Sequence, residues 1–134
     1  MSLYRAKLGD EVLTQLKDYV AAHLDEPIQV VTLAGLAGYS LFHFSRMFTQ
    51  SVGMPPHRYI VLLRLERAIE LAGDEKLRLA EIAARTGFAD QSHLSRWVRR
   101  VYGMPLTQLV AGRRNSRNLH DPAAAASYIA SNNA

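Results

Sequence analysis

The chain contains one short segment twice, and this repetition decides the expected fold. Residues 33–46 read LAGLAGYSLFHFSR, and residues 82–96 read IAARTGFADQSHLSR. His43 of the first copy corresponds to His93 of the second, 50 positions later, and the tripeptide Gly-Met-Pro that begins at residue 53 returns at the same offset. Two copies are too few for a solenoid. The repeat therefore indicates a duplicated two-helix unit.

Each copy has the features of a helix-turn-helix. A glycine, Gly38 in the first copy and Gly87 in the second, permits the positive φ that a sharp turn between two helices needs. A large side chain follows each glycine, Tyr39 and Phe88 respectively. We expect both of these side chains to fill the core beneath the turn.

Apolar periodicity and turn residues predict further helices outside the repeat. Apolar side chains recur at spacings of three and four residues, and Gly or Pro separates these stretches. Thr32, Ser40 and Asp90 have side chains that cap helix N-termini. We expect helices at about residues 12–24, 32–37, 40–52, 55–72, 79–85, 90–101 and 105–113.

These helices predict an all-α fold with four parts. Alternation of apolar and polar residues, which is typical of strands, does not occur. We expect a first helix-turn-helix unit at residues 10–54, a long linker helix at 55–73 and a second unit at 74–113. Residues 114–134 have little to bury and are expected to form a loosely structured tail.

Composition excludes several classes of protein. The 134 residues include 49% hydrophobic residues and no cysteine, which indicates one globular domain, or two very small ones that share a core, without disulfides, thiolate zinc sites or a cysteine nucleophile. No apolar run reaches the ~20 residues of a membrane-spanning helix. His43 and His93 lie in separate units, with no nearby cysteine or paired carboxylate at ligand spacing, and no general acid–base pair is indicated. We therefore expect a cytoplasmic protein that is not an enzyme and has no catalytic residues, metal or cofactor.

Basic residues are concentrated in the second half of the chain. The net charge is +4, and residues 91–120 contain six arginines and no acidic residue. Such a segment is typical of a surface that faces nucleic-acid phosphates. The alternative is a helical protein-interaction module with an incidental basic surface. Arg64 and Arg85 are interpreted as surface residues or as partners in weak intramolecular ion pairs.

The second helix of each unit has an outward face suited to DNA bases. In the first unit, the phase of the helix places Phe44 and Phe48 inward and Phe42 outward with Arg46. Arginine pairs with guanine, glutamine pairs with adenine, and apolar groups contact the thymine methyl. The outward residues of the second unit have this chemistry too; they are Gln91, Ser92, Ser95, Arg96 and Arg99.

The linker helix has a length suited to one DNA duplex. At 1.5 Å per residue, residues 56–72 span about 25 Å. Successive major-groove openings on one face of B-DNA lie about 34 Å apart. We therefore expect two recognition helices, held by the linker helix, in adjacent major grooves of double-stranded DNA.

The combined motifs resemble the AraC/XylS family of transcription regulators over about residues 10–113. The segments that carry the resemblance are 33–34, 37–40, 43–46, 59–60, 64–65, 82–83, 87–88, 90–93 and 95–96. The resemblance implies a seven-helix domain that binds promoter DNA in transcription regulation and often recruits RNA polymerase. It also implies either a stand-alone regulator, as in the MarA/SoxS branch, or a domain whose effector-binding domain lies outside this chain. Regulators that repair DNA by methyl transfer need an acceptor cysteine, which this chain lacks.

The resemblance also implies roles for individual residues. The positions that match base-reading residues of the family are Phe42, Ser45, Arg46, Gln91, Ser92 and Arg96. Arg58, at the start of the linker helix, matches a position that contacts phosphate. We expect further phosphate contacts from the polar side chains around the two reading faces, namely Ser40, His43, Thr49, His93, Ser95, Arg99 and Arg100.

Overall fold

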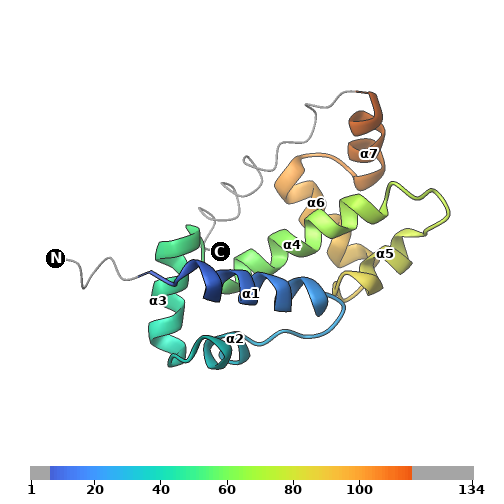
Figure 1. Ribbon diagram of the computed structural model, residues 1–134. Coiled ribbons are helices and arrows are strands. Elements are labelled where there is room, and N and C mark those ends of the chain that lie inside the picture. The colour runs from blue at the N-terminus through green and yellow to red at the C-terminus, as the bar shows by residue number, and fades with distance from the viewer. Residues whose placement is uncertain (1–6, 116–134) are drawn as a thin grey trace.

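The computed structural model describes residues 7–115, which form seven helices and no strand (Figure 1). The all-α prediction is confirmed. The helices are α1 (Asp10–Ala22), α2 (Val30–Ala37), α3 (Leu41–Val52), α4 (Pro56–Leu71), α5 (Leu79–Arg85), α6 (Gln91–Tyr102) and α7 (Leu106–Asn115). None of them is long and apolar enough to cross a membrane. The tail expected at 114–134 lies, beyond Asn115, outside the described residues.

Two of the three expected N-caps are confirmed. The Ser40 side chain accepts a hydrogen bond from the His43 N–H at 3.3 Å, and Asp90 Oδ1 accepts one from the His93 N–H at 2.8 Å. The prediction for Thr32 is wrong because α2 begins two residues earlier. Its N-cap is Gln29, whose carbonyl accepts the Thr32 N–H at 3.0 Å, so Thr32 lies inside the first turn of the helix.

The two turns have the same backbone geometry but different surroundings. Gly38 and Gly87 have φ values of 80° and 82°, as their place in the turn predicts. Phe88 is buried, as expected. The prediction for Tyr39 is wrong, because 42% of its surface is exposed. Among the described residues, there is open space beside Gly38 in the first turn, whereas other segments pack closely against Gly87 in the second.

The helix α4 belongs to both hydrophobic cores of the molecule. Ile60, near its start, packs in the first core with residues of α1, α2 and α3. Leu65 and Ile69, further along, pack in the second core with residues of α5, α6 and α7. Figure 1 shows α4 running between the two groups of helices. Since one rigid helix contributes to both cores, it holds α3 and α6 in a defined relative position.

Candidate nucleic-acid interface

The helix α3 presents an aromatic ring beside an arginine. Phe42 has 69% of its surface exposed, as its helical phase predicts, whereas Phe44 and Phe48 on the opposite side are buried. The Arg46 guanidinium lies over the Phe42 ring, 5.7 Å from its centroid. Together with Ser45, Thr49 and Gln50, these two residues line a shallow hollow. The first unit therefore offers an apolar surface and a bidentate hydrogen-bond donor at one place.

Two hydroxyl groups near this hollow also take part in local hydrogen bonds. The Thr49 hydroxyl donates to the Ser45 carbonyl at 2.8 Å. The Ser40 oxygen accepts the capping bond described above. Each oxygen retains lone-pair capacity, and the Ser40 hydroxyl hydrogen is available to a phosphate oxygen.

The helix α6 presents a more strongly basic face. Leu94 and Val98 are fully buried, which fixes the rotation of the helix. The opposite side is exposed and carries Gln91, Ser92, Ser95, Arg96, Arg99 and Arg100. The Arg100 guanidinium lies 5.4 Å from the centroid of the half-buried Trp97 ring. No acidic residue occurs in α6, and the arginines from Arg96 onward make its exposed face attractive to anions.

The two faces occupy equivalent positions in the two units. Both helices have 12 residues, begin after a capping side chain and end at a glycine with positive φ. Arg46 is the sixth residue of α3, and Arg96 is the sixth residue of α6. Both helices pack against α4 through their buried sides. The structure thus places the predicted base-reading residues on two corresponding exposed helix faces.

The two histidines of the repeat differ in their local contacts. His93 Nδ1 accepts the Ala89 N–H at 3.2 Å, and its ring lies edge-on to Phe88. His93 therefore braces the turn before α6. His43 is exposed, with its ring near that of Phe42. Among residues 7–115, no three His, Asp or Glu side chains gather as metal ligands.

Arg58, at the start of α4, is more buried than the other residues expected to contact phosphate. Only 6% of its surface is exposed, which makes it the one buried arginine among the residues whose burial is described. Arginine is seldom buried unless it has partners within the protein. Burial also lowers the pKa of the neighbouring His57, and the positive charge of Arg58 lowers it further. Burial leaves little of Arg58 accessible, and its expected phosphate contact is kept as a proposal.

Other groups with displaced pKa values also lie on α4. Burial raises the pKa of Tyr59, and the charge of Glu66 adds to this effect. Burial likewise raises the pKa of Glu66, with a further contribution from Glu70. These shifts result from the packing of α4 against its neighbours, and the groups lie outside the exposed faces of α3 and α6.

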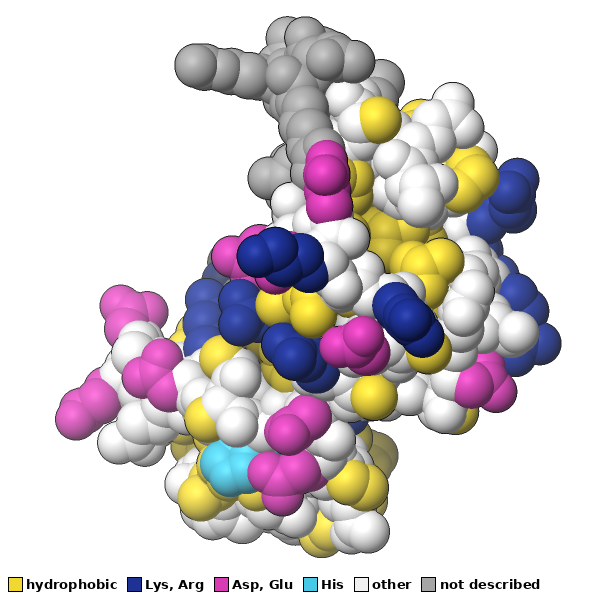
Figure 2. Space-filling view, turned by 90° about the vertical axis from the view of Figure 1, so that its right-hand side faces the viewer, with side chains coloured by type: hydrophobic (Ala, Val, Ile, Leu, Met, Phe, Trp, Pro, Cys, Tyr) yellow, Lys and Arg dark blue, Asp and Glu magenta, His cyan; other side chains and the backbone are white. Residues whose placement is uncertain are grey.

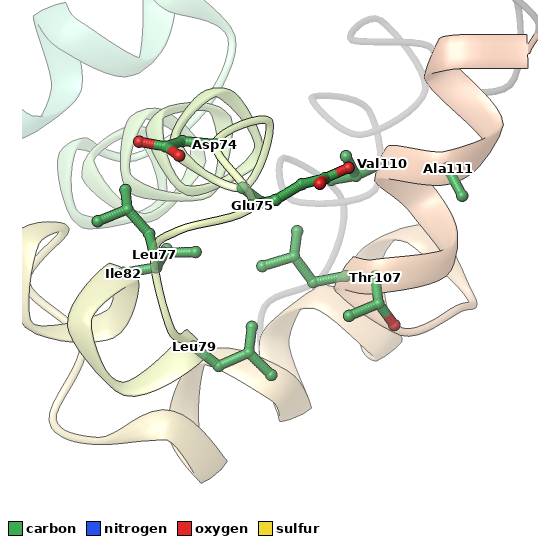
Figure 3. A pocket seen from close by; sticks show the side chains of 10 residues that line it. Asp74, Glu75, Leu77, Leu79, Ile82, Thr107, Val110 and Ala111 are labelled. Carbon is green, nitrogen blue, oxygen red and sulfur yellow. The ribbon is translucent and has the colours of Figure 1, made fainter.

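A separate hollow lies between the α4–α5 loop, α5 and α7. Leu77 and Leu79 face Thr107 and Val110 across it, and the carboxylate-bearing loop forms its rim (Figure 3). Figure 2, which views this end of the molecule, shows acidic and basic side chains interspersed around apolar ones. The mostly apolar wall offers no arrangement for acid–base chemistry. The hollow contains none of the predicted base-reading residues.

Sequence reasoning missed two residues of the exposed faces. Gln50 lines the hollow on α3 with Arg46, and Trp97 lines a second hollow on α6 with Arg96 and Arg100. In both cases the helical spacing could have indicated that the residue lies beside a predicted site residue. Gln50 follows Arg46 by four residues, and Arg100 follows Trp97 by three, so each pair shares a face.

Comparison with known sequences identifies similar proteins. The family model described as "Helix-turn-helix domain" matches residues 33–112. The chain is 32% identical over 93 residues to the probable transcriptional regulator LumQ of Photobacterium leiognathi, covering 69% of this chain and 38% of LumQ. It is 31% identical over 99 residues to the HTH-type transcriptional activator Btr of Bacillus subtilis (strain 168), covering 70% of this chain and 19% of Btr. The chain therefore spans well under half the length of these relatives.

Solved structures give the same result. An AraC-type transcriptional regulator from Chromobacterium violaceum superposes with a TM-score of 0.70 at 27% identity, covering 77% of this chain and 92% of that one. The DNA-binding domain of the global transcriptional factor AdpA, solved in complex with a target DNA, superposes with a TM-score of 0.69 at 28% identity. That match covers 81% of this chain and 97% of the AdpA domain.

Proposed function

Because the chain belongs to the AraC-type helix-turn-helix family of DNA-binding domains, we propose that it inserts α3 and α6 into adjacent major grooves of one promoter duplex. Sequence-specific DNA binding in transcription regulation is the function of this domain. We propose in addition that the two units bind one site together, each through its own recognition helix.

One observation carries the proposal, namely the two equivalent exposed faces on helices that α4 joins through two cores. The 16 residues of α4 span about 24 Å, and the bodies of the two units add to this length. Adjacent major grooves on one face of B-DNA open about 34 Å apart. The dimensions therefore support two contacts one helical turn apart.

We assign direct base contacts to six residues on the two faces, Phe42, Ser45, Arg46, Gln91, Ser92 and Arg96. The proposed phosphate-contacting set comprises Ser40, His43, Thr49, Arg58, His93, Ser95, Arg99 and Arg100. In functional terms, the first unit comprises residues 10–54, the linker 55–73 and the second unit 74–113. Phosphate contacts supply affinity and register, whereas base contacts supply specificity.

Further parts of the proposal concern the protein as a whole. We propose that it acts in the cytoplasm without enzymatic activity of its own and that RNA polymerase is a partner. An effector-binding domain outside this chain is a further proposed partner. The short coverage of LumQ and Btr supports this last proposal, because those regulators contain much more sequence than the DNA-binding part.

Selection of random duplex oligonucleotides on the purified chain tests the proposed binding mode. We expect the selected sequences to contain two information-rich blocks, separated centre to centre by about 10 base pairs. A matched Arg67→Ala variant should select the same blocks, because Arg67 is exposed on α4 and pairs with Glu70, one helical turn away on the same helix. A single block, or no enriched sequence, would contradict the proposal.

A further inference from the structure

Arg64 lies where three segments that are distant in the sequence meet. It belongs to α4, and its Nη2 donates a hydrogen bond of 2.9 Å to the Glu26 carbonyl in the segment between α1 and α2. It also lines a hollow with Gly87 and Phe88, in the turn between α5 and α6. Arg64 therefore contacts both helix-turn-helix units from the helix that joins them.

The contact between Arg64 and the second turn is close. A Cβ atom added to Gly87 would lie 2.7 Å from Arg64 Nε and 2.8 Å from its Cζ, and it would overlap the Leu24 carbonyl oxygen. Leu24 is itself buried in the first core. The backbone of the second turn thus packs directly on the first unit and on the Arg64 side chain.

The repeat offers an internal comparison for this contact. Gly38, the counterpart of Gly87 in the first turn, has nearly the same φ, yet a Cβ added there would meet no atom within 4 Å. Close packing is therefore no requirement of the turn itself. It is a feature of the place where the two units meet.

The guanidinium of Arg64 is held at an energetic cost. Its Nε is buried and has no hydrogen-bond partner, and burial lowers its pKa. An arginine nevertheless keeps its charge in proteins, and an unpaired buried donor is unfavourable. We infer that the Arg64 side chain, which keeps this position despite the cost, serves to hold the Glu26 segment and the turn at Gly87 in place.

We propose that Arg64 is a positioning residue that sets the offset between the two recognition helices. The proposal rests on the proposed function, because this offset matters when α3 and α6 bind one duplex. The segment that contains Glu26 leads directly into α2, which packs on α3, and Gly87 lies three residues before the N-cap of α6. A bridge between these points restricts rotation of one unit against the other.

DNA spacing provides the first test. One inserted base pair moves the second block by about 3.4 Å along the duplex and rotates it by about 34°. On the selected two-block duplex, we expect one inserted base pair to weaken wild-type binding at least about tenfold, equivalent to one lost base contact. In Arg64→Met, this discrimination should fall to about threefold or less. Arg64→Lys retains a donor for the Glu26 carbonyl and should recover part of the discrimination between the two spacings.

A control variant and a half-site separate positioning from stability. Arg67→Met, on the exposed side of the same helix, should discriminate between spacings like the wild type. A duplex with only the first block should bind the Arg64→Met chain as tightly as it binds the wild type. Equal weakening on all duplexes, or unchanged spacing discrimination, would overturn the proposal.

A second test needs no DNA and so remains decisive if the proposed function fails. The chain has no cysteine, so Thr49→Cys on α3 and Ser95→Cys on α6 provide unique sites for spin labels. Electron–electron double resonance should show a narrow distance distribution in the wild-type and Arg67→Met backgrounds. The distribution should be broader in the Arg64→Met background, and an unchanged distribution there would reject a positioning role for Arg64.

Discussion

Phe42 and Arg46 bring together, within about one helical turn, side chains suited to two kinds of base recognition. The exposed ring offers an apolar surface for a thymine methyl, and the arginine offers two parallel donors for guanine. Because the guanidinium lies over the ring, part of the ring surface is shielded from water in the free protein. The same contact restricts the rotamers of Arg46 and so reduces the entropy lost on binding.

Replacement of the two arginines on the reading faces tests the assignment of base contacts. We expect Arg46→Ala and Arg96→Ala each to weaken binding to the selected duplex by about 1–3 kcal/mol, because each removes a bidentate pair. Binding to random duplex should change little. Fluorescence anisotropy on both duplexes measures the two effects, with Arg67→Ala as control. Equal losses on selected and random DNA would reject the assignment.

Helical phase predicted which residues of α3 and α6 face outward. It did not predict the burial of residues whose surroundings depend on distant segments. The residues that face away from the core of α3 follow from local spacing alone, and the exposed position of Phe42 confirms that prediction. The buried position of Arg58 and the exposed position of Tyr39 do not follow in this way. Each depends on which other helix covers the site, and a motif contains no information about that.

At the scale of secondary-structure elements, local hydrogen-bonding chemistry determines where the two corresponding helices α3 and α6 begin. Ser40 and Asp90 accept equivalent N–H groups, so α3 and α6 begin at corresponding points of the repeat. The two turns repeat one more hydrogen bond, in which the N–H of the residue after the glycine donates to the carbonyl five residues earlier, at 3.0 Å in both. The start of α2 was mispredicted because its N-cap, Gln29, makes no side-chain cap bond.

The two turn glycines should differ in their tolerance of alanine. Gly38→Ala should reduce the free energy of unfolding by about 1–2 kcal/mol, the cost of a left-handed conformation for an L-residue. Gly87→Ala has the same cost, and displacement of Arg64 and Leu24 should add about 1–3 kcal/mol. Urea denaturation of both variants measures the difference. Equal losses would mean that the second turn relaxes away from α4.

At the scale of the whole molecule, duplication gives one chain two exposed helix faces, proposed to read bases, that are not identical. The face of α3 carries one arginine beside a phenylalanine, whereas the face of α6 carries a glutamine and three arginines. The two blocks of DNA are therefore expected to differ, which defines the orientation of the protein on its site. The sequence repeat predicted the two corresponding helix faces. The bridge through Arg64 was not predicted, because it joins residues from three separate segments.

Salt dependence should reveal how the basic face of α6 contributes to affinity. Each cationic phosphate contact releases counterions, so log K should fall with log salt concentration with a slope of about −0.9 per contact. Arg99→Ala and Arg100→Ala should each reduce the steepness by about 0.9, because both side chains are exposed beside the reading face. Arg67→Ala should leave the slope unchanged, since Arg67 lies on α4 and pairs with Glu70.

The same salt titration distinguishes DNA binding from protein interaction as the purpose of the basic surface. If the arginines of α6 were incidental to a protein-interaction module, affinity for duplex DNA would be weak, and neither substitution would change its slope. If the arginines neutralise phosphates, each substitution makes the slope less steep on random and selected duplexes alike, because phosphate contacts do not depend on sequence. A slope that changed only on the selected duplex would instead assign Arg99 or Arg100 to base recognition.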